Sequence, residues 1–447
     1  MIILRFKKFL TLLLAAAIAP LGTGTATATP PDDLTITIFA SSNKPPEIPL
    51  GIKKADADRI LTSSGAVELS SEGSANSHRY DGSKLPFVNG SSRKAENAIP
   101  NTFENCRANP GGTATLYGLV IDRHTFCRHG YLVARATNSS DTEVGSLLYR
   151  ETHTGAGING TREALVSIQL DDFRPVGVFS YASLVAISLK TSSEQDVNPN
   201  DPSAPKACTA AGAGGAIQDP VFGWKARSSV SWSILSDPAL GAEDERKVDC
   251  HWKFTHQVRV NDPANAFPWT SEFGRPAQDL RFDSAGYLTK KDGSVFTRAV
   301  PYLEYSRTDP RVKSVAEHIY TAFNNPSSTL PAKSDGSPKV IPGNISGTPP
   351  TLVTRLFPGA NPIAQRSYDD NRLEVAKACA GIPHNPDEQC DEFPFASTWE
   401  GAAMPGGNFS VRYVDGTENG AAGTALATWL GSDRILHNEK YGVDIIP

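Results

Sequence analysis

Three carboxylates lie within ten residues near the C-terminal end of the chain. Asp391, Glu392 and Glu400 follow Cys390 and are interspersed with aromatic residues that a folded core would bury. Carboxylates this close repel one another unless a cation neutralises them. Such a group could hold a hard divalent cation and take a proton from a water molecule. On composition alone, it could equally be a solvated acidic face or a calcium site.

The elements around these residues are predicted from their local patterns. A helix through residues 373–379 precedes the carboxylates, alternation through 409–414 predicts a strand, and small residues through 421–430 predict a second helix. The order is strand, loop, strand, helix. Asp391 then falls on the first strand and Asn419 at the start of the last helix.

A longer pattern surrounds the carboxylates. Residues 390–398 read CDEFPFAST, and they are followed by Glu400-Gly401, by Glu418-Asn419 and by Ala422-Gly423. This combination resembles the secreted bacterial NucA/NucB-type deoxyribonuclease domain over about residues 365–447. Residues 123–127 and 316–319 resemble, more loosely, longer actinobacterial exported proteins that end in this domain.

The resemblance implies a compact ββα-metal nuclease core that hydrolyses phosphodiester bonds, mainly of DNA and with RNA as the alternative substrate, using one divalent cation, Mg²⁺ or Mn²⁺. Asp391 matches the general-base position, Glu400 the acidic residue before the glycine, and Asn419 the metal-ligand asparagine. Glu400 is expected to share the ion with Asn419. Glu392 is a further candidate for the catalytic group, ranked below these three.

One departure from the family pattern favours another function. Gly420 stands where smaller members often carry arginine, which removes a cation that could stabilise phosphate. Residues 363–447 carry six basic and thirteen acidic side chains, a net charge of −7, which disfavours polyanion binding without a metal. The alternative is a secreted binding or cell-envelope protein whose nuclease-like domain is inactive.

The N-terminus predicts export. Arg5, Lys7 and Lys8 precede an apolar run through residues 9–19, and small residues lead to a cleavage site near Ala28. Residues 1–28 therefore read as a signal peptide. The run is shorter than the ~20 residues that a spanning helix needs, and no later segment reads as a membrane span, so a secreted, extracellular product is expected.

The even number of cysteines fits an oxidising destination. Six cysteines allow 15 pairings, and the simplest hypothesis is three sequence-local disulfides. These would join Cys106 to Cys127, Cys208 to Cys250, and Cys379 to Cys390. Metal sites built on His124, Cys127 and His129, or on Cys250, His251 and His256, lack the paired spacing of structural zinc sites and are less favoured.

The rest of the chain predicts an α+β multidomain protein. Residues 29–105 read as a low-complexity leader, and 106–323 as a β-rich, sandwich-like domain that ends in a helix. His318 lies beside the apolar face of that helix and reads as a packed or surface histidine. Residues 324–362 are rich in proline and predict a semi-stiff linker before the nuclease-like domain at 363–447. The net charge of −5 provides no overall basic field that would attract nucleic acid.

Overall fold

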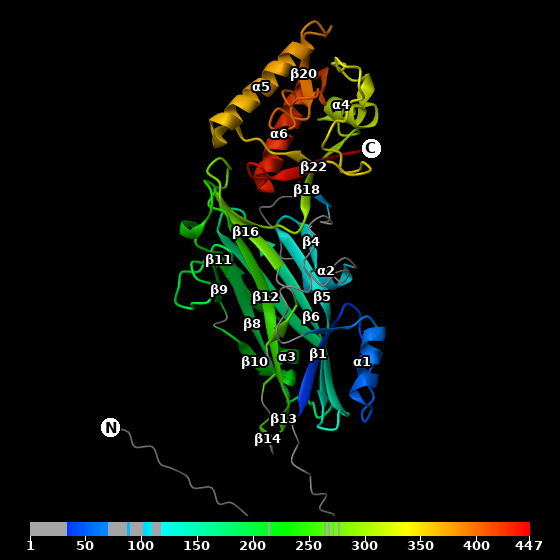
Figure 1. The fold of residues 1–447 in the computed structure, drawn as a ribbon, viewed down its shortest axis with the longest axis vertical. Helices are drawn as coiled ribbons and strands as arrows, with labels where there is room; N and C mark the ends of the chain where they lie inside the picture. The colour runs from blue at the N-terminus through cyan, green and yellow to red at the C-terminus, as the bar shows by residue number, and fades with distance from the viewer. Residues whose placement is uncertain are drawn as a thin grey trace, which may run out of the picture.

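A computed structural model of the chain describes residues 34–69, 87–89, 102–109, 118–212, 215–262, 265–266, 269–270, 272–275 and 278–447. The predicted signal peptide, residues 1–28, lies outside them. The described part is rich in strands and contains few helices. A long β-structure lies below a smaller unit that carries the C-terminus (Figure 1).

The larger of the two long sheets is antiparallel and has eight strands. They are β1 (Thr35–Ser41), β2 (Val67–Leu69), β4 (Leu119–Asp122), β5 (Thr125–Thr137), β6 (Glu143–Gly157), β7 (Glu163–Gly177), β9 (Cys208–Gly212) and β11 (Val230–Ser236). Their order is β2, β1, β5, β6, β7, β11, β9, and β4 pairs with the start of β5.

The second long sheet is also antiparallel and has six strands. They are β8 (Leu184–Ser193), β10 (Ile217–Pro220), β12 (Val248–Arg259), β15 (Phe273–Gly274), β16 (Gln278–Ser284) and β17 (Asp292–Phe296). Their order is β10, β8, β12, β16, β17, with β15 beside β12. The short pair β13 (Asn261–Asp262) and β14 (Asn265–Ala266) follows β12.

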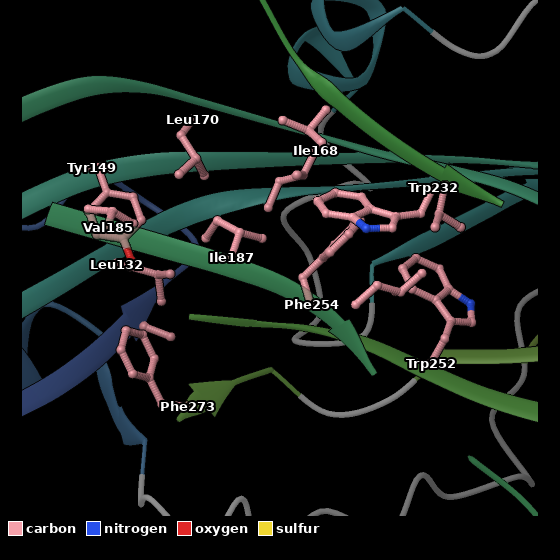
Figure 2. Packing of buried hydrophobic residues seen from close by; sticks show 14 of the residues in the cluster. Leu132, Tyr149, Ile168, Leu170, Val185, Ile187, Trp232, Trp252, Phe254 and Phe273 are labelled. Atoms are coloured by element: carbon pink, nitrogen blue, oxygen red, sulfur yellow. The ribbon is translucent and has the colours of Figure 1, made fainter. Parts of the chain in front are cut away.

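The two sheets share one apolar core, as the sandwich prediction requires. Alternate side chains of each strand point to the same face, so Leu132 and Ile168 of one sheet meet Ile187 and Phe254 of the other (Figure 2). Each fully buried side chain of this kind stabilises the fold by ~1.5–3 kcal/mol. Short helices lie around the sandwich: α1 (Lys54–Ser63), α2 (Phe103–Ala108), α3 (Val221–Ala226) and the 3₁₀ turn η4 (Pro238–Leu240).

Part of the predicted leader belongs to this sandwich. Strand β1 pairs with β5 along all seven of its residues, and Ile38, Phe39 and Ala40 are buried. The apolar run of β1 is too short to stand out from the polar residues around it, and its partner lies about a hundred residues away.

The smaller unit is built on a four-stranded sheet with the order β19, β22, β18, β3. Its strands are β3 (Phe87–Asn89), β18 (Val300–Ser306), β19 (Val353–Thr354) and β22 (Lys440–Ile446). The hairpin of β20 (Glu388–Phe393) and β21 (Ser410–Asp415) completes it, with helices α4 (Lys313–Asn324), α5 (Pro362–Cys379) and α6 (Gly416–Ser432). Two 3₁₀ turns, η5 (Pro326–Ser328) and η6 (Pro358–Ala360), lie between α4 and α5.

The unit begins earlier in the chain than the sequence predicted. Strand β18 pairs in parallel with β22, and α4 packs in the same core as α6, so residues 300–324 belong with the C-terminal elements. A parallel pair joins segments distant in sequence, which a local pattern does not reveal.

The proline-rich segment predicted as a linker packs on this unit. Within residues 324–362, Lys339 is buried and its Nζ donates hydrogen bonds to the carbonyl oxygens of Thr329 (3.1 Å) and Phe409 (2.8 Å). Strand β19 adds to the sheet beside β22. Prolines lack a backbone donor, but side chains and the remaining amides supply the bonds that hold the segment in place.

Buried ion pairs join the sandwich to the C-terminal unit. Arg434 donates from Nε to Asp283 Oδ1 at 3.0 Å, and both side chains are fully buried. Glu439 accepts from Arg123 (2.6 Å) and Arg281 (2.8 Å). Burial alone would raise the pKa of Glu439, but these two guanidinium groups lower it to about 2. The two parts are therefore held by ion pairs that are mostly shielded from water, the Arg434–Asp283 pair fully so.

The six cysteines form three disulfides, in the sequence-local pairs that were expected. They are Cys106–Cys127, Cys208–Cys250 and Cys379–Cys390.

Candidate active site

A disulfide fixes the strand that carries the first carboxylates. The side chain of Asn361 caps α5 by accepting from Ala364 N at 2.9 Å, and Pro362 takes the first helical position, where its missing N–H is not needed. The helix ends at Cys379, which is bonded to Cys390 on β20. The residue directly before Asp391 is thereby tied to α5.

The hairpin and α6 place Asp391 and Asn419 near one another. Strands β20 and β21 pair antiparallel with Asp391 opposite Arg412. Helix α6 begins directly after β21, and Asp415 caps it by accepting from two backbone amides of the first turn, at 2.9 and 3.0 Å. Asn419 lies in this first turn.

A cleft of about 380 Å³ lies where β20 meets α5 and α6. Tyr305 and Leu426 are among its apolar lining. Its polar lining includes residues of three elements: Arg372 of α5, Gln389, Asp391 and Glu392 of β20, and Asn419 of α6.

Asp391 is 6% exposed, and one of its two oxygens is held by a buried histidine. Oδ2 lies 2.7 Å from Nδ1 of His318, and the other ring nitrogen of His318 lies 2.7 Å from Ser410 Oγ. This leaves Oδ1 as the oxygen available to a group in the cleft.

Glu392 has an altered acidity. Burial raises its pKa, the negative charge of Asp391 raises it further, and the result is about 7 even though the Ala396 amide and Arg372 oppose the shift. The Ala396 amide donates to Oε1 at 3.2 Å. Without a further positive charge, this carboxyl is half protonated near neutral pH.

Asn419 lines the cleft with a side-chain amide. Its Nδ2 donates to Gln389 Oε1 at 3.3 Å, which leaves the amide oxygen of Asn419 unused by that bond. Amide and carboxylate oxygens are the ligands that hard cations such as Mg²⁺ prefer. Asn419, Asp391 and Glu392 therefore form an oxygen-rich lining.

Arg372 brings a positive charge to the same cleft. It lies on α5 with Nη1 donating to Tyr368 Oη at 3.3 Å, and its charge acts on Glu392. Among the residues that line the cleft, all within the described chain, Arg372 is the one cation. Gly420, where the family often has arginine, faces open space.

Glu400 lies away from this cleft, in contrast to the expectation that it shares an ion with Asn419. Its Oε2 accepts from Thr354 N at 2.7 Å and its Oε1 from Thr354 Oγ1 at 2.8 Å. Both oxygens thus hold β19 against the loop after β20, and Glu400 is not among the lining residues. The physical reason is that Thr354 of β19, which lies in the predicted linker, donates hydrogen bonds to both carboxylate oxygens of Glu400.

Two groups, one that lines the cleft and one that contacts Asp391, were missed by sequence reasoning. His318 was interpreted as a packing or surface residue, and Arg372 had no assigned role. His318 lies 73 positions before Asp391, so no local spacing connects them. The position of Arg372 on the predicted helix before the carboxylates was the one available signal.

A second group of possible ligands lies inside the sandwich. The ligand atoms of Glu151, His153 and His256 lie within 4.8 Å of one another, and all three residues are buried. Arg128 Nη2 lies 2.8 Å from His153 Nδ1. A guanidinium can only donate, so Nδ1 accepts and the proton of the neutral ring sits on Nε2, facing Glu151.

That arrangement does not suit a cation. A metal-bound histidine needs a lone pair on the nitrogen that faces the ion, and here Nε2 of His153 carries a proton instead. Burial, reinforced by the charge of Arg128, lowers the pKa of His153 to about 3, so its ring is neutral at physiological pH. Arg275 also pairs with Glu151, at 2.6 Å. This group is a hydrogen-bonded polar core.

Comparison with known proteins identifies the region that contains the cleft. Residues 348–444 match the family model of deoxyribonuclease NucA/NucB. No curated protein matches the chain. The match includes α5, β20, β21 and α6, which supply every polar group of the cleft lining named above. Residues 348–444, at the C-terminal end of this 447-residue chain, are therefore a NucA/NucB deoxyribonuclease domain.

Proposed function

We propose that the chain is a secreted endonuclease that hydrolyses phosphodiester bonds of DNA with one divalent cation. The observation that carries the proposal is the cleft in the NucA/NucB domain, which is lined by two carboxylates, two amides and a guanidinium from three elements. Nuclease chemistry needs a base, a cation site and a contact for phosphate, and these residue types supply all three.

The donor set fits a hard cation. Glu392 and Asn419 offer oxygen atoms, and burial and the charge of Asp391 raise the pKa of the Glu392 carboxyl to about 7, so that a cation would favour its ionised form. We assign these two residues as the ligands of Mg²⁺ or Mn²⁺, in place of Glu400. A bound divalent cation would neutralise the phosphodiester and stabilise the leaving oxygen.

Asp391 is assigned as the general base. Its free oxygen can accept the proton of the attacking water while His318 holds the other oxygen. Arg372 is assigned to the phosphate of the substrate, because a guanidinium can donate two parallel hydrogen bonds to phosphate oxygens. Arg372 thus compensates for Gly420.

Secretion is part of the proposal because of the cysteines and the N-terminal run. Three disulfides persist in oxidising compartments and are rare in the cytosol. Residues 1–28 have the pattern of a signal peptide.

The described helices were compared with the requirements for crossing a membrane. Among the described residues, no helix combines the length and the apolar character needed to cross a bilayer.

The test is plasmid digestion by the purified full chain. Supercoiled DNA should be cut with Mg²⁺ or Mn²⁺, and chelation with EDTA should stop the reaction. Intact plasmid with either metal would contradict the proposal and favour the inactive, binding alternative, for which the exposed Gly420 is the motivating observation.

The variant Asn419→Ala tests whether Asn419 is a ligand of the cation. The variant should require a higher Mn²⁺ concentration for half-maximal cleavage, because it loses one ligand. Thr424→Ala, on the same helix outside the cleft lining, is the matched control. Equal metal dependence in both variants would show that Asn419 is no ligand.

A further inference from the structure

His318 contacts the cleft residue Asp391 from outside the matched family region. It lies on α4, which ends at Asn324, before the match begins at residue 348. Its side chain is 1% exposed, and α4 packs with α6 in the core of the C-terminal unit (Figure 1). A polar ring buried to this degree needs partners at both nitrogens.

Both ring nitrogens of His318 have a hydrogen-bond partner. Nδ1 lies 2.7 Å from Asp391 Oδ2, and Nε2 lies 2.7 Å from Ser410 Oγ. A carboxylate oxygen only accepts, so Nδ1 carries a proton whether the ring is neutral or charged. The hydroxyl of Ser410 can donate to Nε2 or accept from it, so it satisfies the ring in either state.

Ser410, His318 and Asp391 are hydrogen-bonded in the order of a nucleophilic triad. The burial of Ser410 argues against nucleophilic catalysis by its hydroxyl. Ser410 is 0% exposed, which disfavours direct attack of its hydroxyl on a substrate. Ser410 and His318 border a separate cavity of about 340 Å³, and Asp391 is the member of the three that lines the cleft of the NucA/NucB domain.

We infer that His318 is the positioning residue for Asp391. Its Nδ1–H holds Oδ2 and fixes the rotation of the carboxylate, so that Oδ1 faces the cleft and the water that it deprotonates. Ser410, anchored in β21, fixes the ring in turn. The inference rests on the proposed function of Asp391, and it extends the working nuclease unit back to α4.

Kinetics of the full-length chain on plasmid DNA test this role. His318→Leu removes both hydrogen bonds and should lower kcat by about 10- to 100-fold, the range found when outer-shell partners are removed. KM for DNA should stay within about twofold, because His318 does not contact the substrate. His318→Asn keeps a side-chain N–H near the position of Nδ1 and should restore most of kcat.

Two controls separate positioning from general damage. His384→Asn changes an exposed histidine of the same unit, outside the cleft lining, and should keep the parental kcat. Thermal unfolding of each variant shows whether it is folded at the assay temperature. A folded His318→Leu with parental kcat, or a His318→Asn as slow as His318→Leu, would overturn the positioning role.

A readout without activity tests the hydrogen bond itself. In NMR spectra of isotope-labelled histidine, the Nδ1 proton of His318 should be protected from water exchange in the parent and in Ser410→Ala, and exposed to exchange in Asp391→Ala. Loss of protection in Ser410→Ala alone would contradict the inference. A parent that never cuts DNA would overturn the proposed function and this role with it, whereas an active parent with an unaffected His318→Leu would overturn this role alone.

Discussion

The charges of the proposed base, Asp391, and of Arg372 both act on Glu392, and the protonation of Glu392 depends on the charges around it. Burial and the neighbouring Asp391 raise its pKa to about 7 from an ordinary 4.5, against the effect of Arg372. Between these values the folded chain keeps a proton that the unfolded chain has lost. The free energy of unfolding therefore falls as pH rises from about 4.5 to about 7.

The prediction for Glu392 is a loss of this pH dependence in Glu392→Gln. Chemical denaturation in EDTA measures how far the free energy of unfolding falls between pH 4.5 and pH 7. This fall should be larger in the parent than in Glu392→Gln, by at most on the order of 3 kcal/mol. Glu374→Gln, on the same unit and outside the cleft lining, is the control and should resemble the parent. Parallel curves for the parent and Glu392→Gln would contradict the assignment.

The prediction for Arg372 concerns phosphate. Arg372→Ala should lower kcat/KM on DNA by about 10²-fold, because a charged donor to the developing negative charge is removed. Arg366→Ala changes an exposed arginine on the same helix, away from the cleft lining, and should have little effect. If the two variants are equally active, phosphate is held elsewhere.

At the scale of elements, the Cys379–Cys390 disulfide is the contact that fixes β20 beside α5. It closes a short loop, with a sequence separation of 11, and such a crosslink stabilises by about 2–3 kcal/mol. Replacing both cysteines by serine should lower the free energy of unfolding by that amount and also reduce kcat.

The Cys208–Cys250 pair provides the comparison. It joins strands of the sandwich, so its removal should lower stability while the cleavage rate of the remaining folded protein is kept. Denaturation curves and plasmid assays on both double variants check this. Equal loss of kcat from both changes would mean that the disulfide beside Asp391 has no local role.

The elements show how far sequence reasoning reaches. The strand, loop, strand, helix order around Asp391 and Asn419 was predicted because alternation, small residues and turn signals are local, and the structure has β20, β21 and α6 there. The membership of β18 in the C-terminal unit was not predicted, because its pairing with β22 joins residues about 140 positions apart. The roles of Asp391, Glu392 and Asn419 stay predictions, and the link from His318 to Asp391 comes from tertiary structure alone.

At the scale of the whole molecule, the sandwich and the nuclease unit share a buried charge network. Arg434 pairs with Asp283 and also donates to Asn159 and to backbone oxygens of the sandwich. Removing one partner leaves the other charge buried without compensation. Asp283 and Arg434 are both fully buried, so the loss of either partner should destabilise the interface between the sandwich and the C-terminal unit.

Arg434→Ala should therefore lower the free energy of unfolding by about 3–5 kcal/mol. Replacing both partners, Arg434→Met with Asp283→Leu, should recover most of the loss, because no unpaired charge is left. Thermal or chemical denaturation measures both. A double variant no more stable than Arg434→Ala would indicate that the other hydrogen bonds of Arg434 dominate at this joint.

The central claim, that the cleft beside β20 is the cutting site, is tested most directly by the cleavage rate of Asp391→Asn. This change keeps the size of the side chain and removes the base, so kcat on DNA with Mn²⁺ should fall by about 10²–10⁴-fold. Asp387→Asn, on an exposed residue outside the cleft lining, should cut at the parental rate. A folded Asp391→Asn that digests DNA as fast as the parent would place the chemistry elsewhere and contradict the account.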